Sequence, residues 1–437
     1  MLIQHTLNVY KKPRQAISGN AGSPVINDEQ LARYRITDYK HKISAIGGYD
    51  TASCTVMCRL SEAERIFEAF VGNRVEIYGD DPVLPCWEGL INAATLQVGR
   101  VQIRRSLDKM VNSVRVLYSN ASGTPTTTST VTLENLDSIA IYGTKQATFD
   151  FGEVYDISGV PGGQLNGPEA LIRSRLRELA WPVKTRQITQ DRAILLTLEF
   201  IGFYHTLDWV SYENTNTSTL DIAQALGYYA VDAFTWINDL GPNHSTTPGN
   251  GNGLFYDDTI DDYLLSTILE PWVRVERRLG ESSWQYINKL AETGVYGFID
   301  SITAKTGSQL ALGISGTNPN NNARHFYSKI ASREEKYTIR ALGDGNVRDL
   351  YGRIVPPWTV QPDGLAIIRD ILIGYSLQNE NDDPRIGYIS RVDYDGNTGE
   401  VALTFGDDIS IEGVLGLTEQ IKSTSQRFGA TKRQALV

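Results

Sequence analysis

The first 135 residues consist of short runs of Val, Ile, Tyr and Thr separated by Gly, Asn, Asp and Pro. Short β-branched and aromatic runs bounded by turn residues are typical of β-strands. The predicted strands are 35–46, 52–60, 74–78, 86–96, 101–107 and 112–118.

One helix is predicted among these strands. Ser61 can cap its first turn while the side chain of Glu64 reaches back to the Ser61 amide, and Gly72 ends the helix. The apolar residues between them fall on one side and are Ile66, Phe67 and Phe70.

A change of pattern follows at residues 119–132, which are rich in Ser and Thr and lack an apolar period, so they are predicted to form a linker or long loop. A strand is predicted at 148–155. A helix should begin at Pro168, whose fixed φ suits the first helical position, and end before Trp181. Its predicted buried stripe is Leu171, Ile172, Leu176 and Leu179.

The middle of the chain mixes helix and loop signals. The apolar run 193–204 predicts a strand, and helical spacing predicts a short helix that begins at Thr219. Residues 238–262 have the composition of a long surface loop. A second helix is predicted with Ser282 or Ser283 as its N-cap.

Strand patterns return towards the C-terminal end, at 295–314 and again from residue 339. Two alternating runs between 391 and 405 flank a turn sequence, which predicts a β-hairpin. The turn residues are Asp395, Gly396, Asn397, Thr398 and Gly399.

These elements predict a β-rich α+β fold with several domains, in which β-barrel or sandwich domains carry short helical inserts. Four regions are expected. They are 1–135, a β domain with one short helix; 136–212, an α+β domain; 213–335, a helical and loop-rich region; and 336–437, a C-terminal β domain.

The net negative charge limits the classes of molecule that the chain can bind. With 437 residues and a formal net charge of -10, the chain lacks the basic field that general or sequence-specific nucleic-acid binding requires. Neither a signal-type apolar run nor a stretch approaching the roughly 20 apolar residues of a membrane span occurs. Synthesis and folding in a cytoplasm are therefore expected.

Residues that could carry chemistry are few. Cys54, Cys58 and Cys86 cannot all pair with one another and make a poor zinc framework, so free thiols are expected. None of the five histidines lies in a catalytic motif, and the Gly-x-Ser-x-Gly elbow is absent. His205, expected on an apolar strand, could be a general base, but a structural role is favoured. The histidines are His5, His41, His205, His244 and His325.

Two acidic segments were weighed as ligand sites. Residues 257–262 could bind calcium or supply a carboxylate pair for glycan hydrolysis, although a solvated loop is favoured. The segment that begins at Asp393 lacks the Gly and Glu of a calcium loop, so the hairpin is favoured. The glycines before Pro168 fit no nucleotide-binding motif. No catalytic, metal or cofactor residue is assigned, and no enzyme is expected.

Three motifs occur in order near the start of the chain. They are Gly47-Gly48-Tyr49-Asp50, Cys86-Trp87-Glu88-Gly89-Leu90-Ile91-Asn92 and Asn112-Ser113-Val114-Arg115-Val116-Leu117-Tyr118. Together with Gly72-Asn73-Arg74-Val75 and two later helix segments, this series resembles the hub and tail-tip proteins of tailed bacteriophages.

The resemblance implies a non-enzymatic structural subunit of a virion tail. It would form a ring, commonly a trimer, that joins the tail tube to the tail tip and contacts the tape-measure protein, with distal tail, fibre or tip proteins as further partners. The alternative that the residues leave open is a glycan-binding adhesin or carbohydrate-active tail enzyme, since aromatic faces and paired carboxylates suit sugars. An unrelated β-rich protein is the third reading.

Overall fold

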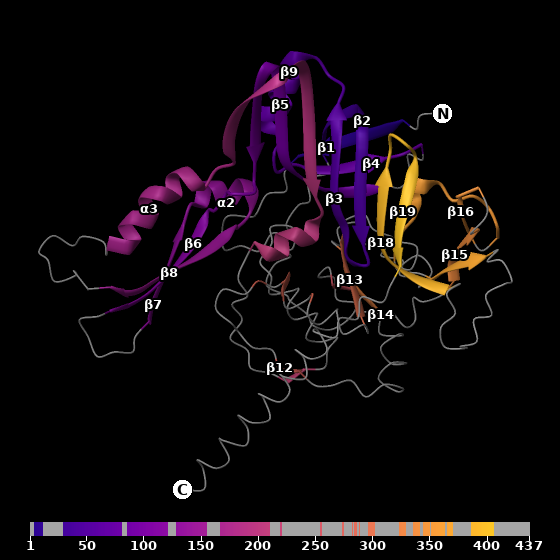
Figure 1. The fold of residues 1–437 in the computed structure, drawn as a ribbon. Coiled ribbons are helices and arrows are strands. Elements are labelled where there is room, and N and C mark those ends of the chain that lie inside the picture. Colours follow the sequence, from indigo (N-terminus) through magenta and orange to yellow (C-terminus); the bar gives the residue numbers. More distant parts are fainter. Residues whose placement is uncertain are drawn as a thin grey trace, which may run out of the picture.

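A computed structural model gives the architecture of the chain (Figure 1). It describes residues 4–11, 29–80, 85–120, 128–154, 167–209, 335–340, 344–349, 351–362, 365–369 and 386–405, and short pieces between them at 219–220, 254–255, 273–274, 282, 284–285, 288, 296–301 and 323–328.

Strands dominate these residues. The first nine are β1 His5–Tyr10, β2 Gln30–Ser44, β3 Ile46–Val56, β4 Arg74–Tyr78, β5 Trp87–Ser106, β6 Ser113–Asn120, β7 Thr128–Glu134, β8 Gln146–Val154 and β9 Val183–Ile201. The others are β10 Thr219–Leu220, β11 Leu254–Phe255, β12 Val273–Arg274, β13 Tyr296–Ser301, β14 Ala323–Ser328, β15 Glu335–Arg340, β16 Val347–Arg348, β17 Leu365–Arg369, β18 Ile386–Asp395 and β19 Glu400–Phe405.

Helices are short and few in the described ranges. The α-helices are α1 Leu60–Ala69, α2 Leu136–Tyr142 and α3 Gly167–Leu179, and the 3-10 helices are η1 Phe203–Asp208 and η2 Pro357–Thr359. The fold is therefore β-rich, with large antiparallel sheets, as the sequence predicts.

Six of the strands pair in a closed cycle. β1 pairs with β2, β2 with β3, β3 with β9, β9 with β5, β5 with β4, and β4 with β1, and every one of these pairings is antiparallel. The C-terminal part of β2 also pairs with β18, so strands from both ends of the chain belong to one sheet system.

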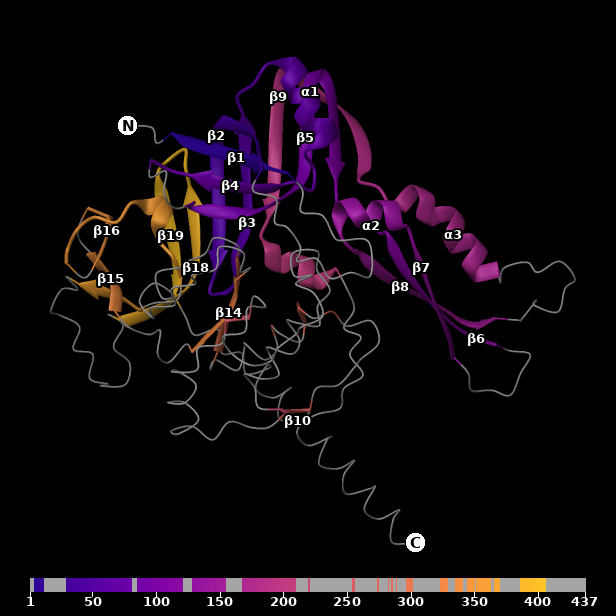
Figure 2. The same ribbon diagram turned by 180° about the vertical axis from the view of Figure 1, so that it is seen from behind.

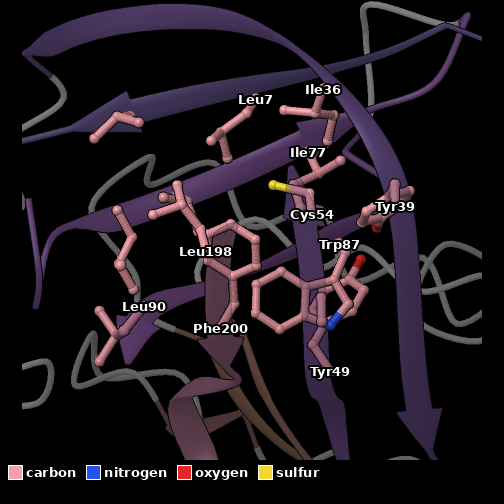
Figure 3. Packing of buried hydrophobic residues seen from close by; sticks show 14 of the residues in the cluster. Leu7, Ile36, Tyr39, Tyr49, Cys54, Ile77, Trp87, Leu90, Leu198 and Phe200 are labelled. Atoms are coloured by element: carbon pink, nitrogen blue, oxygen red, sulfur yellow. The ribbon is translucent and has the colours of Figure 1, made fainter. Parts of the chain in front are cut away.

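The interior of this cycle is apolar (Figure 3). Trp87 is fully buried and its ring lies against Phe200 and Tyr49, with centroid separations of 5.8 and 6.1 Å. Aliphatic residues from every strand of the cycle surround it, and burial of each contributes about 1.5–3 kcal/mol. Among them are Leu7, Ile36, Cys54, Ile77, Leu90 and Leu198.

A bulge in β2 keeps this core continuous. Before it, Tyr34 and Ile36 are buried, whereas after it Tyr39 and His41 are, so the alternation of inward and outward residues changes phase. The register shifts at this point, and Asp38 adopts a positive φ of 51°. An extra residue in one strand has this effect, and Asp tolerates the left-handed conformation better than most residues.

A smaller unit is inserted between β5 and β9. Its three-stranded sheet has the order β7-β6-β8, and helix α3 packs on it (Figure 2). Its core consists of Val114, Val116, Leu133, Ile172 and Leu176.

Several sequence predictions are confirmed. β4 occupies 74–78 as predicted, and the C-terminal hairpin forms from β18 and β19, with the Gly399 amide donating to Asp395 O across the turn. Ser282 Oγ accepts from the Gln285 amide at 3.3 Å, the contact expected of the predicted N-cap; most of the helix predicted there lies outside the described residues. The three cysteines are free, two of them buried.

Other strand predictions were wrong. The predicted linker contains β7, which pairs with β6, and the predicted strands 86–96 and 101–107 are one strand, β5. The apparent break in β5 is a bulge at Gly99, where φ is +60° and the register shifts. Gly marks bulges as readily as it marks turns, which explains the second error.

The helix predictions also need correction. Helix α1 begins one residue before Ser61, and its N-cap, Arg59, makes no side-chain capping bond. Leu171 of α3 is exposed, and Thr219 lies in a strand rather than at the start of a helix. Helix α2 was not predicted; the side chain of Asn135 caps it by accepting from the Ser138 amide. The four-region division stays a prediction.

The closed strand cycle leaves no space for a side chain at Gly202. An added Cβ would lie 1.6 Å from Tyr49 O, so Gly202→Ala should lower the free energy of unfolding by about 3 kcal/mol or more, measured by urea denaturation. Gly99→Ala is the control, because open space surrounds it; only its positive φ should cost roughly 1–2 kcal/mol. Equal losses for the two variants would contradict this account.

Candidate functional site

A groove of about 610 Å³ crosses the outer face of the sheet at β19, β18, β2, β3, β9 and β5. The strands supply outward-facing polar residues here, because their alternate residues face the core. Thus Thr51 and Ser53 line the groove, while Cys54 on the same strand is buried. The other polar lining residues are Lys40, Lys42, Asn92, Glu199, Arg391, Asp393, Asp395 and Glu400.

Opposite charges are paired along this groove. Lys40 Nζ lies 2.7 Å from Asp395 Oδ2, and Arg391 Nη2 lies 2.9 Å from Asp393 Oδ1. The bond from Lys40 is the main reason why the pKa of Asp395 lies below its ordinary value. Each such half-exposed pair contributes only about 0–1 kcal/mol to stability. The groove therefore presents ionised groups of both signs.

Glu199, a further carboxylate of the groove, is also paired. Its Oε2 accepts from Arg104 Nη2 at 2.8 Å, and the same guanidinium reaches Asp108 Oδ2 at 2.8 Å. This network raises the pKa of Arg104, with the bond to Glu199 as the largest cause. The side chain of Glu199 is thereby held in place by Arg104.

A cluster of polar and aromatic side chains lies next to the groove, beside Thr51. Asp50 Oδ1 accepts from Tyr204 Oη at 2.7 Å and from His205 Nε2 at 2.8 Å. The rings of Tyr204 and His205 stack with centroids 4.1 Å apart, and Trp284 lies 4.5 Å from Tyr204. These contacts join β3, η1 and the second predicted helix.

Electrostatics keep Asp50 ionised. Burial alone would raise the pKa of this carboxyl group, but the bonds from His205 and Tyr204 and the positive charge of Arg391 together lower it. Gly47 allows the cluster to form: its φ is +102°, and a Cβ there would lie 2.8 Å from the Tyr204 ring. We call Asp50, Tyr204 and His205 the clasp, because the ionised Asp50 accepts hydrogen bonds from the other two and so holds η1 against β3.

The structure corrects the sequence-based position of His205, which lies in η1 and not on a strand. It contacts Asp50 and Tyr204 there, and its structural role stays a prediction. His244 and residues 257–262 lie outside the described residues, as do the glycines before Pro168 apart from Gly167. The segment that begins at Asp393 forms the hairpin.

Two further histidines form a buried polar cluster that the sequence did not predict. Tyr39 Oη and His41 Nδ1 lie 2.8 Å apart, and Tyr394 Oη lies 3.3 Å from His5 Nε2. The four rings contact one another, with centroids 4.6–6.1 Å apart. The alternation around His41 could have shown its inward direction, but not its partners, because those come from strands distant in the sequence.

Burial changes the acidity of this cluster. It lowers the pKa of His5 to about 4 against a smaller opposing effect of Asp80, and the pKa of His41 to about 3, where His5 adds to the effect. Tyr39 and Tyr394 have raised pKa values for the same reason. Both histidines are therefore neutral in the folded protein near neutral pH.

The motif residues that carried the resemblance have structural contacts. Gly89 lies so close to Ile201 O that a Cβ would come within 2.2 Å of it. Asn112 is fully buried; its Nδ2 donates to Gly143 O at 2.7 Å, and its Oδ1 accepts from the Lys145 amide at 2.7 Å. Asn112 thus fixes the start of the inserted unit against the end of α2.

The described residues contain neither a candidate metal cluster nor a helix that could span a membrane. No group of three or more His, Cys, Asp or Glu side chains in this part of the chain is placed to hold a metal ion. No helix within it has the length and apolarity needed to cross a membrane.

Comparison with known proteins gave no relative: no family model, no curated protein and no solved structure matches this chain significantly.

Acid should destabilise the protein through His5 and His41. The unfolded state binds protons near the ordinary pKa of 6.5, whereas the folded state does so only near 4 and 3. The free energy of unfolding should therefore fall as pH drops below 6.5, by at most about 1.4 kcal/mol per pH unit for each histidine. Urea denaturation between pH 7 and pH 5 measures this slope.

His41→Phe removes one of these groups and should reduce the slope by about one proton. An unchanged slope in His41→Phe would show that His41 does not titrate as described.

Proposed function

We propose that this chain is a structural subunit of a phage-type tail, at the hub or tip. It assembles with copies of itself into a ring, most simply a trimer, and joins the tail tube to the tip. Its neighbours would be tube, distal tail, tape-measure and fibre or tip proteins, and its place the virion tail after synthesis in the host cytoplasm.

The observation that carries this proposal is the closed cycle of six antiparallel strands. We interpret it as the β-barrel, tube-like domain that the resemblance implies. A closed cycle leaves few free strand edges, and its interior is filled by Trp87 and its neighbours. A barrel whose interior is filled by side chains suits a rigid structural subunit better than a protein that binds a ligand inside its barrel.

The chemistry of the groove also favours assembly over catalysis. Sugar cleavage by paired carboxylates needs one with a raised pKa that donates a proton. Three of the four carboxylates that line the groove face a cation; they are Asp395, Asp393 and Glu199. For Asp395, the bond from Lys40 lowers the pKa, the opposite of what a proton donor needs. A surface of fixed charges of both signs suits a protein partner, which it can orient.

A glycan-binding adhesin is less well supported by the same groove. Sugar rings are commonly held against exposed aromatic faces. The aromatic carbocyclic residues among its lining, Phe200 and Tyr394, are 1% and 2% exposed, so they offer no ring face to a sugar.

Light scattering of the purified protein over a range of concentrations tests the proposal. A ring should give a mass that is an integral multiple of 48.5 kDa, with three copies as the expected value. A glycan array run on the same sample should give no specific binding. A monomer mass at every concentration, or saturable binding of one glycan class, would contradict the structural reading.

A further inference from the structure

The long strands β5 and β9 bend together and expose apolar side chains at the bend. Both strands rise to the top of the molecule beside α1 (Figures 1 and 2). At the bend the register shifts, with Gly99 opposite Ala193 and Val101 opposite Ile188.

The exposed side chains continue the core-facing stripe of the sheet. Leu96 and Leu196 are opposite one another and buried. Two residues further along each strand, Val98 and Ile194 are also opposite one another, so they share that face. Yet Val98 is 40% and Ile194 is 64% exposed.

The other side of the bend repeats this pattern. Ile103 packs against the main core, and Val101, two residues before it, faces the same way. Val101 and its cross-strand partner Ile188 are 47% and 85% exposed. We call Val98, Val101, Ile188 and Ile194 the bend patch. Grouped exposed apolar side chains of this kind mark interaction sites.

Positive charge flanks the bend patch. Arg100 and Arg186 are both exposed, and among the described residues no hydrogen bond or ion pair joins either side chain to an acid. The chain as a whole has a net charge of -10. A second copy of this acidic chain is therefore electrostatically complementary to the locally basic bend.

A matching surface lies on α2. Asp137 and Ile141 are four residues apart, so they share one side of the helix, and both are exposed. Leu136, at the start of α2, is 63% exposed. Within the part of the chain that the structure describes, no hydrogen bond or ion pair joins the Asp137 side chain to a base. Apolar residues beside this acid are the complement of the apolar residues beside Arg100 and Arg186.

We propose that the bend patch of one copy packs against α2 of the next copy, with Arg100 and Arg186 facing Asp137. This inference rests on the proposed function and names the contact between ring neighbours. Because the two surfaces differ, the contact is head-to-tail, and repetition closes a ring when the rotation between copies permits. This contact explains why the bend patch is exposed to solvent in the single chain, because the helix that covers it belongs to the next copy.

Sedimentation velocity on the full chain tests this contact. The double variant Ile188→Asp, Ile194→Asp should raise the dissociation constant of the oligomer roughly tenfold or more, because it places charge in an apolar contact. Tyr351→Asp is the control: Tyr351 is 83% exposed and follows β16, the last strand in the sheet order, so its variant should assemble normally. Circular dichroism spectra of the folded proteins should be unchanged in both variants.

Charge reversal gives a second readout that a folding defect would not produce. Arg100→Glu with Arg186→Glu should weaken assembly, and adding Asp137→Lys to the same chain should restore part of it. Restoration requires that the two surfaces meet.

The outcomes separate this inference from the proposed function. If the wild-type chain forms rings and the bend variant does so with an unchanged dissociation constant, the contact is wrong and the proposed function stands. If wild type is monomeric, both fail. If the bend variant keeps its rings but loses binding to vesicles of anionic lipid, the patch is a membrane contact and the inference is overturned.

Discussion

The structure depends on a close approach of backbones where β3, β9 and β5 meet. Gly202 lies against Tyr49 O and Gly89 against Ile201 O, with no space for a Cβ at either position. This approach brings the fully buried Trp87 between the strands and lets the six-strand cycle close around an apolar interior. The clasp of Asp50, Tyr204 and His205 is anchored one residue away from the first contact. The polar groove is the outer face of the same strands, so its shape follows from the closure.

Much of the strand content could be predicted, because alternation and turn residues are local signals. β4 and the hairpin of β18 and β19 follow that pattern closely. The errors occurred where the same residue type is compatible with two different local structures. The sequence predicts two strands, 86–96 and 101–107, but Gly99 between them forms a bulge inside one strand, β5. The Ser and Thr run read as a linker includes β7, whose order comes from pairing with β6, a tertiary contact that composition does not report.

The candidate site was less accessible to sequence reasoning. Groove residues such as Lys40, Ser53 and Glu199 are ordinary outward residues of separate strands, and only the pairing of β18 with β2 brings Asp395 to Lys40. The buried cluster of His5 and His41 depends on Tyr394, some 390 residues from His5. By contrast, the Gly-Gly-Tyr-Asp and Trp-Glu-Gly motifs include positions of close backbone approach and core packing, as Gly89 and Trp87 show.

The central claim is that this chain is a wall-forming subunit whose barrel-like cycle and outer surfaces serve assembly. Electron microscopy of the purified oligomer, with rotational averaging of single particles, tests it most directly. The account predicts closed rings of uniform size with an open centre, in which each copy contacts two neighbours. Isolated single copies, or irregular clusters without rotational symmetry under conditions where the protein is folded, would contradict it.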